Sequence, residues 1–233
     1  MRSHFPRKRG KKSPLISSPA SAGEVPAHAV ALAKACCTGQ GDCQQLSLTP
    51  AFHAIIRADP GLRAMLDAMQ GFGAPDLWLV SGALFQTVWN VLDGYPRGHG
   101  INDYDLFYFD PDTSMEAEDA WIRKADSHFS FAGHPVQLRN QARVHLWYPD
   151  KFGLPYPQLM SACDGVDQFL VQASVVAVRQ PAANALDIYA PLGLDDIFTR
   201  TLRPNPLWKG PPRKEYHAKC ERYLKHWPSL RMV

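Results

Sequence analysis

The sequence predicts an α/β or α+β fold, with one folded domain preceded by a basic tail. Segments with apolar residues at helical spacing alternate along the chain with short apolar or alternating runs that are typical of strands. A length of 233 residues suits one domain with an extension, and 45% hydrophobic with 20% charged residues is a globular composition. This composition excludes a fully disordered chain. The absence of a heptad or a G-x-y period also excludes a coiled coil and a collagen-like rod.

The net charge of +3 hides an uneven distribution of charge along the chain. The first 12 residues include six basic and no acidic ones, whereas the other 19 basic residues are outnumbered by 22 acidic residues. Residues 1–27 contain few large apolar side chains and cannot bury enough surface to offset their chain entropy. We therefore expect a disordered, low-complexity tail over residues 1–40 and a mildly acidic domain over residues 49–233. Binding to nucleic acid is expected only through the tail.

No segment predicts a membrane span, an export signal or a set of disulfides. The longest nearly apolar stretch, residues 77–85, is far shorter than the roughly 20 residues that a span needs, and no apolar segment follows the basic N-terminus. Five irregularly spaced cysteines favour a reducing compartment, so we expect a cytoplasmic protein. A zinc site is an alternative that no repeated C-x-x-C supports, and its ligands would be Cys36, Cys37 and Cys43 with His28 or His53.

The domain is expected to begin with two helices and a buried strand. Apolar residues at helical spacing start at Thr49, and Asp59-Pro60 divides them into two helices. The apolar run over residues 77–80 predicts a buried strand. Gly82 allows a tight exit from that strand into a helix over residues 83–92.

The rest of the domain continues this alternation of elements. After a loop rich in Gly and Pro, residues 103–110 predict a strand, and Thr113 with Glu116 predicts a capping box for a helix that ends near residue 128. Residues 141–148 fit both a strand and a helix capped by Asn140, and we expect a helix. The remaining predictions are strands over 136–139, 175–178 and 186–189, and helices over 165–170, 195–201 and 213–226.

Two carboxylates on the strand over residues 103–110 are the main candidates for chemistry. Asp103 and Asp105 are two residues apart, so their side chains project to the same face of a strand. Like charges so close repel each other unless a cation or a proton lies between them. Mg²⁺ prefers carboxylate oxygens and leaves coordination positions open for phosphate oxygens. The pair is therefore a candidate site for Mg²⁺ or Mn²⁺, with a solvated turn as the alternative.

A Ser-Gly turn about 20 residues earlier is a candidate phosphate site. Ser81 and Gly82 lie where the predicted buried strand passes into a helix. Backbone N–H groups and the helix dipole at such a position can hold the oxygens of a triphosphate. Glycine lets phosphate approach the backbone, because it has no side chain to hold the ligand away.

These residues form a pattern that resembles the DNA polymerase β-like nucleotidyltransferase superfamily, and more narrowly a group of small bacterial nucleotidyltransferase-like proteins. The resemblance covers roughly residues 49–227, and its matching segments are SGALFQTVWN, INDYDLFYFD, RNQARVHLWY, FG, APLGLDD and RPNP. It implies a mixed sheet flanked by helices, a divalent cation, and transfer of a nucleoside monophosphate from a nucleoside triphosphate to an unknown acceptor hydroxyl. Asp103 and Asp105 are then the catalytic and metal-binding residues, and Ser81 and Gly82 hold the triphosphate.

One position departs from the pattern of the superfamily. The resemblance implies a third carboxylate on a neighbouring strand, and Gln137 occupies that position. An amide can ligate a metal but can neither take a proton nor balance charge. Three interpretations remain open: an enzyme with one well-held metal, a catalytically impaired nucleotide-binding protein, or a site completed by another acid. The candidates for that acid are Asp195, Asp196 and Asp110.

The segment RNQARVHLWY offers further candidate contacts to phosphate. Arg139, Arg143 and His145 lie in this segment, and arginine can bind phosphate through two hydrogen bonds. Arg139 is close in sequence to Gln137, so we expect it to contact phosphate. The alternative is that these side chains pair with local acids or cap helix ends.

Overall fold

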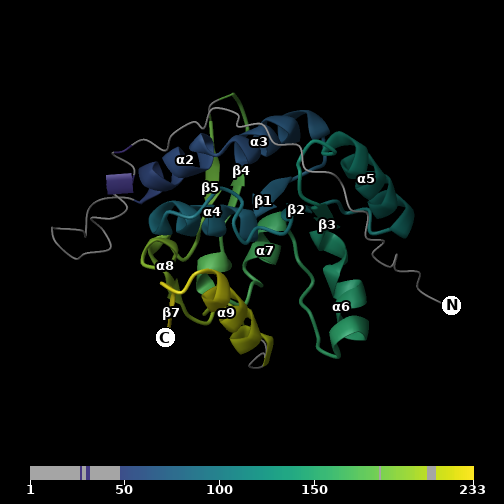
Figure 1. Cartoon of the computed structure of the whole chain (residues 1–233). Helices are drawn as coiled ribbons and strands as arrows, with labels where there is room; N and C mark the ends of the chain where they lie inside the picture. The colour runs from purple at the N-terminus through teal and green to yellow at the C-terminus, as the bar shows by residue number, and fades with distance from the viewer. Residues whose placement is uncertain (1–26, 28–29, 32–47, 184, 209–213) are drawn as a thin grey trace, which may run out of the picture.

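A mixed five-stranded sheet is the centre of the structure, a computed structural model that describes residues 27, 30–31, 48–183, 185–208 and 214–233. The strand order is β3-β2-β1-β4-β5, in which β2 and β3 are parallel and the other neighbours antiparallel. The mixed sheet flanked by helices is as expected (Figure 1). The strands are β1 (Trp78–Val80), β2 (Tyr104–Tyr108), β3 (Val136–Asn140), β4 (Ala177–Arg179) and β5 (Asp187–Tyr189).

Most helices lie close to their predicted positions. The expected break at Asp59-Pro60 is present, and Asp59 caps the second helix by accepting a hydrogen bond from the Leu62 N–H at 2.9 Å. Residues 141–148, which fit two patterns, are helical as expected, with Asn140 as the cap. The helices are α2 (Thr49–Ala58), α3 (Pro60–Phe72), α4 (Gly82–Asp93), α5 (Met115–His128), α6 (Val144–Phe152), α7 (Ala162–Val166), α8 (Asp195–Phe198) and α9 (Lys214–His226), with short 3-10 turns η1 (Gln141–Arg143) and η2 (Gln172–Ser174).

Three local predictions were wrong in position. The cap of α5 is Ser114 rather than Thr113, and its hydroxyl accepts a hydrogen bond from the Ala117 N–H at 3.3 Å. The helix predicted over 165–170 is α7, because Ser161 and Asp164 form a capping box that starts it earlier. Helix α8 ends before Thr201, which belongs instead to β6 (Thr201–Leu202), a strand parallel to β7 (Arg231–Met232).

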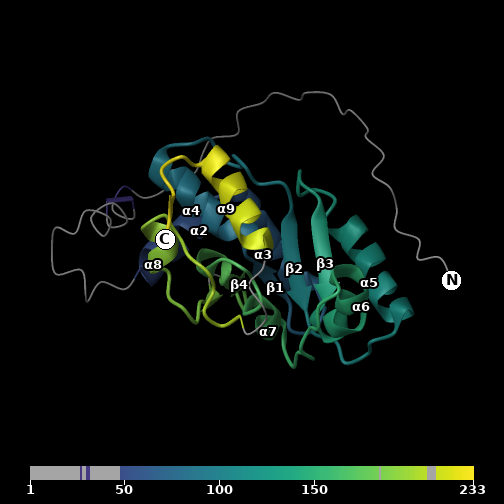
Figure 2. The ribbon, with the colours of Figure 1, turned by 90° about the horizontal axis from the view of Figure 1, so that it is seen from below.

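The two faces of the sheet pack against different sets of elements. On β2, Leu106 and Tyr108 are fully buried in the large core under α2, α3, α4 and α5. Phe107 and Phe109 point to the other face and pack with a smaller cluster that includes α7. Helix α9 packs against α4, where Tyr223 meets Phe85 with ring centroids 5.5 Å apart (Figure 2). Asp105 shares the face of the smaller cluster, next to α9.

Apart from residues 27, 30 and 31, the predicted tail lies outside the described residues, and so do the three cysteines of the alternative zinc site. Within the described ranges, no helix is long and apolar enough to cross a membrane.

Candidate active site

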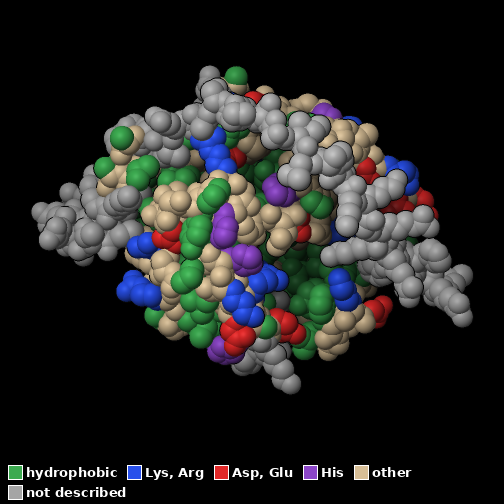
Figure 3. All heavy atoms as spheres, in the orientation of Figure 1, with side chains coloured by type: hydrophobic (Ala, Val, Ile, Leu, Met, Phe, Trp, Pro, Cys, Tyr) green, Lys and Arg blue, Asp and Glu red, His purple; other side chains and the backbone are tan. Residues whose placement is uncertain are grey.

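A cavity of about 330 Å³ lies between the sheet and α9, and we call it the α9 cavity. One side is formed by the β1–α4 turn, the start of β2 and a residue of β3; the other is formed by α9 and Phe169. In the space-filling view, Lys, Arg and His side chains gather over the position of α9, beside a hollow in this face (Figure 3). The cavity brings together most of the residues that the sequence singled out, namely Ser81, Gly82, Asp103, Asp105 and Gln137.

Asp103 and Asp105 both line the α9 cavity, at the point where β2 begins. Asp105 pairs with Val80 of β1 and with Gln137 of β3, which fixes its place on the sheet. Burial and, after it, the nearby charge of Asp103 raise the pKa of Asp105 to about 6, while Lys219 and Arg139 act in the opposite direction. Two carboxylates held this close at neutral pH form a site that a bound cation would stabilise.

The Ser81-Gly82 turn presents the start of α4 to the same cavity. The Ser81 N–H donates to the Val176 carbonyl at 2.8 Å, which anchors the turn to the sheet. Ser81 adopts φ 55° and ψ −113°, a conformation with positive φ that is uncommon for a residue other than glycine. The first N–H groups of a helix have no partners in a preceding turn of that helix, and Ser81 and Gly82 line the cavity, so the positive end of the α4 dipole lies at the cavity wall.

Gly82 is not required by the packing of the protein itself. A Cβ atom placed there would lie 3.5 Å from Gln86 Nε2, an ordinary contact, and the backbone is outside the left-handed region. Gly100 in the same cavity differs, because its φ is +71° and a Cβ atom would lie 2.3 Å from the Trp227 ring. The space over Gly82 is therefore available to a ligand.

Gln86, one turn along α4, adds a further polar group to the cavity. Its side chain is 9% exposed, and its Oε1 atom has no hydrogen-bond partner among the described residues. A buried polar atom without a partner is costly unless a ligand or water satisfies it. The sequence had not singled out this residue, and a lone Gln within an amphipathic helix carries no signal that would do so.

Gln137 faces the carboxylates through its nitrogen atom. Its Nε2 atom donates a hydrogen bond to Asp103 Oδ2. The described residues contain no group of three or more His, Cys, Asp or Glu side chains that could hold a metal ion. The three acids considered as replacements do not line the cavity: Asp110 accepts from Trp121, Asp196 pairs with Arg203, and Asp195 lies at the start of α8. The donor set of Asp103 and Asp105 thus fits one divalent cation and does not complete a site for two.

Helix α9 supplies the basic side of the cavity, which the sequence analysis missed. Lys219, Arg222 and His226 line the cavity at a spacing of three and four residues, next to the buried stripe of Tyr216, Cys220 and Tyr223. The helix that carries this stripe was predicted, over residues 213–226. Cationic residues recurring along its border at helical spacing were the signal that could have located this wall.

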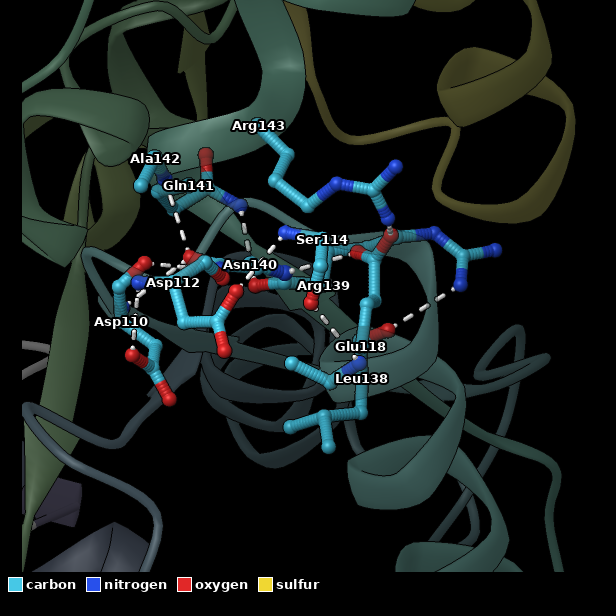
Figure 4. A network of polar contacts seen from close by, with 11 residues as sticks. Asp110, Asp112, Ser114, Glu118, Leu138, Arg139, Asn140, Gln141, Ala142 and Arg143 are labelled. Carbon is cyan, nitrogen blue, oxygen red and sulfur yellow. Dashed lines mark hydrogen bonds and ion pairs between the residues drawn. The ribbon is translucent and has the colours of Figure 1, made fainter.

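The start of the segment RNQARVHLWY belongs to a network of polar contacts with Glu118 and with residues that follow β2 (Figure 4). No residue of this segment lines the α9 cavity. Arg143 forms an ion pair with Glu118 of α5, and Arg139 donates to the Leu138 carbonyl at 3.0 Å. Asn140 ties the ends of β2 and β3 together, because its Oδ1 accepts from the Asp110 N–H at 3.1 Å and its Nδ2 donates to the Asp110 carbonyl at 2.9 Å. The local pairing that was an alternative for Arg143 is therefore present. Contact of Arg139 with phosphate stays a prediction.

Comparisons with known proteins show the family of the chain and, separately, its fold. The sequence model of a family described as nucleotidyltransferase matches residues 67–232. A solved structure, described as an NMR structure that reveals a CCA-adding enzyme head domain, is similar with a TM-score of 0.64 and 22% sequence identity. That match covers 79% of this chain and 95% of the other, and at this identity it shows the fold alone. No curated protein matches the chain.

Proposed function

Since the chain belongs to the nucleotidyltransferase family, we propose that it binds a nucleoside triphosphate in the α9 cavity and transfers the nucleoside monophosphate to an acceptor hydroxyl. The observation that carries this proposal is the convergence of three groups on one cavity: a carboxylate pair, a strand-to-helix turn and a basic helix face. Each group suits a different part of a metal-bound triphosphate.

The carboxylate pair is the part of the site that would hold a divalent cation. Asp103 and Asp105 are the proposed ligands for Mg²⁺ or Mn²⁺, and the amide oxygen of Gln137 is a further predicted ligand. When bound, such a cation supplies charge neutralisation for the leaving pyrophosphate. The residues of the chain contribute position: Asp105 is fixed by its strand pairings, and Asp103 by its hydrogen bond from Gln137.

The remaining groups would bind and orient the polyphosphate. The Ser81-Gly82 turn offers backbone N–H donors at the end of the α4 dipole, and the absence of a Cβ at Gly82 leaves room for close approach. In the transfer, a bond forms between the acceptor oxygen and the α-phosphorus while the bond from that phosphorus to the bridging oxygen breaks. Pyrophosphate leaves, and the proton of the hydroxyl passes to water, because the amide of Gln137 cannot accept it.

Binding of nucleotides is the first test of this proposal. Isothermal titration of the full chain with ATP, GTP, CTP and UTP in Mg²⁺ should show binding of at least one nucleotide. Asp103→Ala should weaken that binding at least about 10-fold, as expected when a charged ligand of the cation is lost. If no nucleotide bound the folded wild-type chain, the proposal would be rejected.

The amide at position 137 favours a second candidate, a protein that binds nucleotide without turnover. The described part of the chain places no third acid beside Asp103 and Asp105, and an amide cannot act as a base. This candidate predicts nucleotide binding without release of pyrophosphate from the wild type, and release after Gln137→Glu. Pyrophosphate release by the wild-type chain, lost in Asp103→Ala, would rule the second candidate out.

A further inference from the structure

The acidic side of the α9 cavity is arranged for one cation. Gln137 stands opposite Asp105 in the pairing of β2 and β3, and its nitrogen donates to Asp103 Oδ2. The opposite orientation of the amide would bring two oxygen acceptors together without a proton between them, which is repulsive. Gln137 therefore braces the Asp103 carboxylate as a donor. In this orientation its oxygen is not directed at Asp103, and it brings no negative charge to hold a second cation.

The basic side of the cavity carries two side chains, Lys219 and Arg222, that form no ion pair among the described residues. Lys219 lies over the rings of Phe169 and Tyr223, with Nζ 5.5 and 5.9 Å from their centroids, and Arg222 lies over Tyr223 at 5.7 Å. Neither side chain forms an ion pair within the described ranges, although Arg143, Arg200 and Arg203 each pair with an acid there. Free cations on the wall of a cavity attract polyanions, and arginine binds phosphate oxygens in pairs.

We propose that the α9 cavity holds the polyphosphate of its nucleotide with a single protein-bound divalent cation, and that Lys219 and Arg222 supply the positive charge a second cation would otherwise bring. This inference rests on the proposed function and adds to it a separate role for each side of the α9 cavity. The carboxylates hold the cation on one side, and α9 neutralises the polyphosphate on the other.

The test counts cations and measures polyphosphate affinity separately. Inorganic tripolyphosphate serves as the probe, because it contains the part that all four nucleotides share. Electron paramagnetic resonance of free Mn²⁺, with the full chain and tripolyphosphate in equal amounts, should show one Mn²⁺ bound per chain. Calorimetry in the same buffer should show tripolyphosphate binding weakened about 10- to 100-fold by Lys219→Met and by Arg222→Met. Mn²⁺ binding in the absence of polyphosphate should persist in both variants.

Two further variants serve as a control for charge and as a test of the number of bound cations. Lys225→Met removes one positive charge from the exposed surface of α9 outside the cavity, so its tripolyphosphate affinity should match that of the wild type. Gln137→Glu adds a carboxylate to the acidic wall and should raise the count of bound Mn²⁺ from one to two.

Three outcomes would overturn the inference while leaving nucleotide binding intact. These are two Mn²⁺ bound to the wild type, tripolyphosphate affinity unchanged in both Lys219→Met and Arg222→Met, and a single Mn²⁺ still bound by Gln137→Glu. By contrast, a folded wild-type chain that bound neither a nucleotide nor tripolyphosphate would reject the proposed function and this inference with it.

Discussion

A substitution at Gly82 distinguishes the requirements of folding from those of ligand binding. The structure leaves room for a Cβ atom at this position, with Gln86 Nε2 the nearest contact at 3.5 Å. Alanine also favours a helix over glycine by up to about 1 kcal/mol. We therefore expect Gly82→Ala to keep or slightly raise the free energy of unfolding while weakening nucleotide binding at least about 10-fold. Urea denaturation and calorimetry of the same preparation measure both quantities.

Gly71 in α3 provides the matched control for that substitution. A Cβ atom there would meet nothing within 4 Å, and the residue does not line the α9 cavity. Gly71→Ala should resemble Gly82→Ala in stability and the wild type in nucleotide affinity. Equal nucleotide affinity in all three proteins would show that the Ser81-Gly82 turn does not contact the ligand.

Asp105 should make the stability of the metal-free protein depend on pH. Its pKa is about 6 in the folded chain against an ordinary value of 3.8, so the folded state favours the protonated form. The contribution of Asp105 to the free energy of unfolding is fully present below about pH 4 and is lost as the pH rises through 6. This amounts to at most about 3 kcal/mol, since one pKa unit corresponds to about 1.4 kcal/mol.

Replacing the Asp105 carboxyl should remove this dependence of the free energy of unfolding on pH. Asp105→Asn is expected to unfold with a free energy about 1–3 kcal/mol higher than the wild type at pH 8, and to differ little from it at pH 4. Asp126→Asn, which changes an exposed carboxyl on α5, should match the wild type at both pH values. Urea denaturation without divalent cations gives the comparison, and an Asp105→Asn variant less stable than the wild type at pH 8 would contradict it.

The acidic side of the site was predictable from the sequence because its two carboxylates follow the two-residue period of a strand. Two acids at a spacing of two on a strand must share a face, and Asp103 with Asp105 indeed line one cavity. The basic side was not predictable in this way. Lys219 and Arg222 come more than 110 residues later, and only the packing of α9 on α4 brings them to the cavity.

Helix α9 is held in place by a buried contact between α4 and Trp227, the residue that follows α9. Asn90 of α4 accepts a hydrogen bond from Trp227 Nε1 at 2.8 Å and donates to the His99 carbonyl at 3.0 Å. Asn90 is 2% exposed, so removing its amide would leave a buried donor and a carbonyl without their partner. This residue couples α4, the loop before β2 and α9, and with them one wall of the α9 cavity.

We expect Asn90→Ala to lower the free energy of unfolding by about 2–3 kcal/mol. Ser127→Ala on α5, which removes an exposed hydroxyl that donates to the Lys124 carbonyl, should change it by less than about 0.5 kcal/mol. Urea denaturation of the two variants and the wild type measures the difference. Equal stability of Asn90→Ala and Ser127→Ala would show that this contact does not hold α9 in place.

Among the elements, long amphipathic patterns were predictable and short irregular ones were not. The helices α2 and α3 followed from apolar spacing and the Asp59-Pro60 break. The pair β6 and β7 was missed because each strand has two residues, too few to show any alternation. The predicted start of α7, residue 165, was too late in the chain. Ser161 and Asp164 form a capping box that starts the helix at Ala162, before the apolar residues on which the prediction depended.

At the level of the whole chain, charge divides the protein into a basic tail and a mildly acidic domain. The first 12 residues carry six positive charges. Among the described residues, those that line the α9 cavity lie between positions 81 and 227. We expect a chain without residues 1–12 to bind nucleotides with unchanged affinity. Any binding of a single-stranded oligonucleotide should fall about 100-fold or more between 50 and 200 mM salt, and should be lost on this deletion.

Fluorescence anisotropy with a labelled oligonucleotide tests the role of the tail. Oligonucleotide binding that survives the deletion, or that is insensitive to salt, would mean that the domain itself recognises nucleic acid. The alternation of helices and strands followed from the pattern of the sequence, and the mixed sheet flanked by helices followed from the resemblance to the nucleotidyltransferases.

The most direct measurement is a crystal structure of the full chain with Mn²⁺ and a nucleoside triphosphate analogue whose α,β bridge is a methylene group. The anomalous signal of manganese locates the cation independently of the protein. The account predicts a manganese peak between Asp103 and Asp105, with the polyphosphate lying between the Ser81-Gly82 turn and Lys219 of α9. A nucleotide bound outside the α9 cavity, or manganese bound away from both carboxylates, would contradict it.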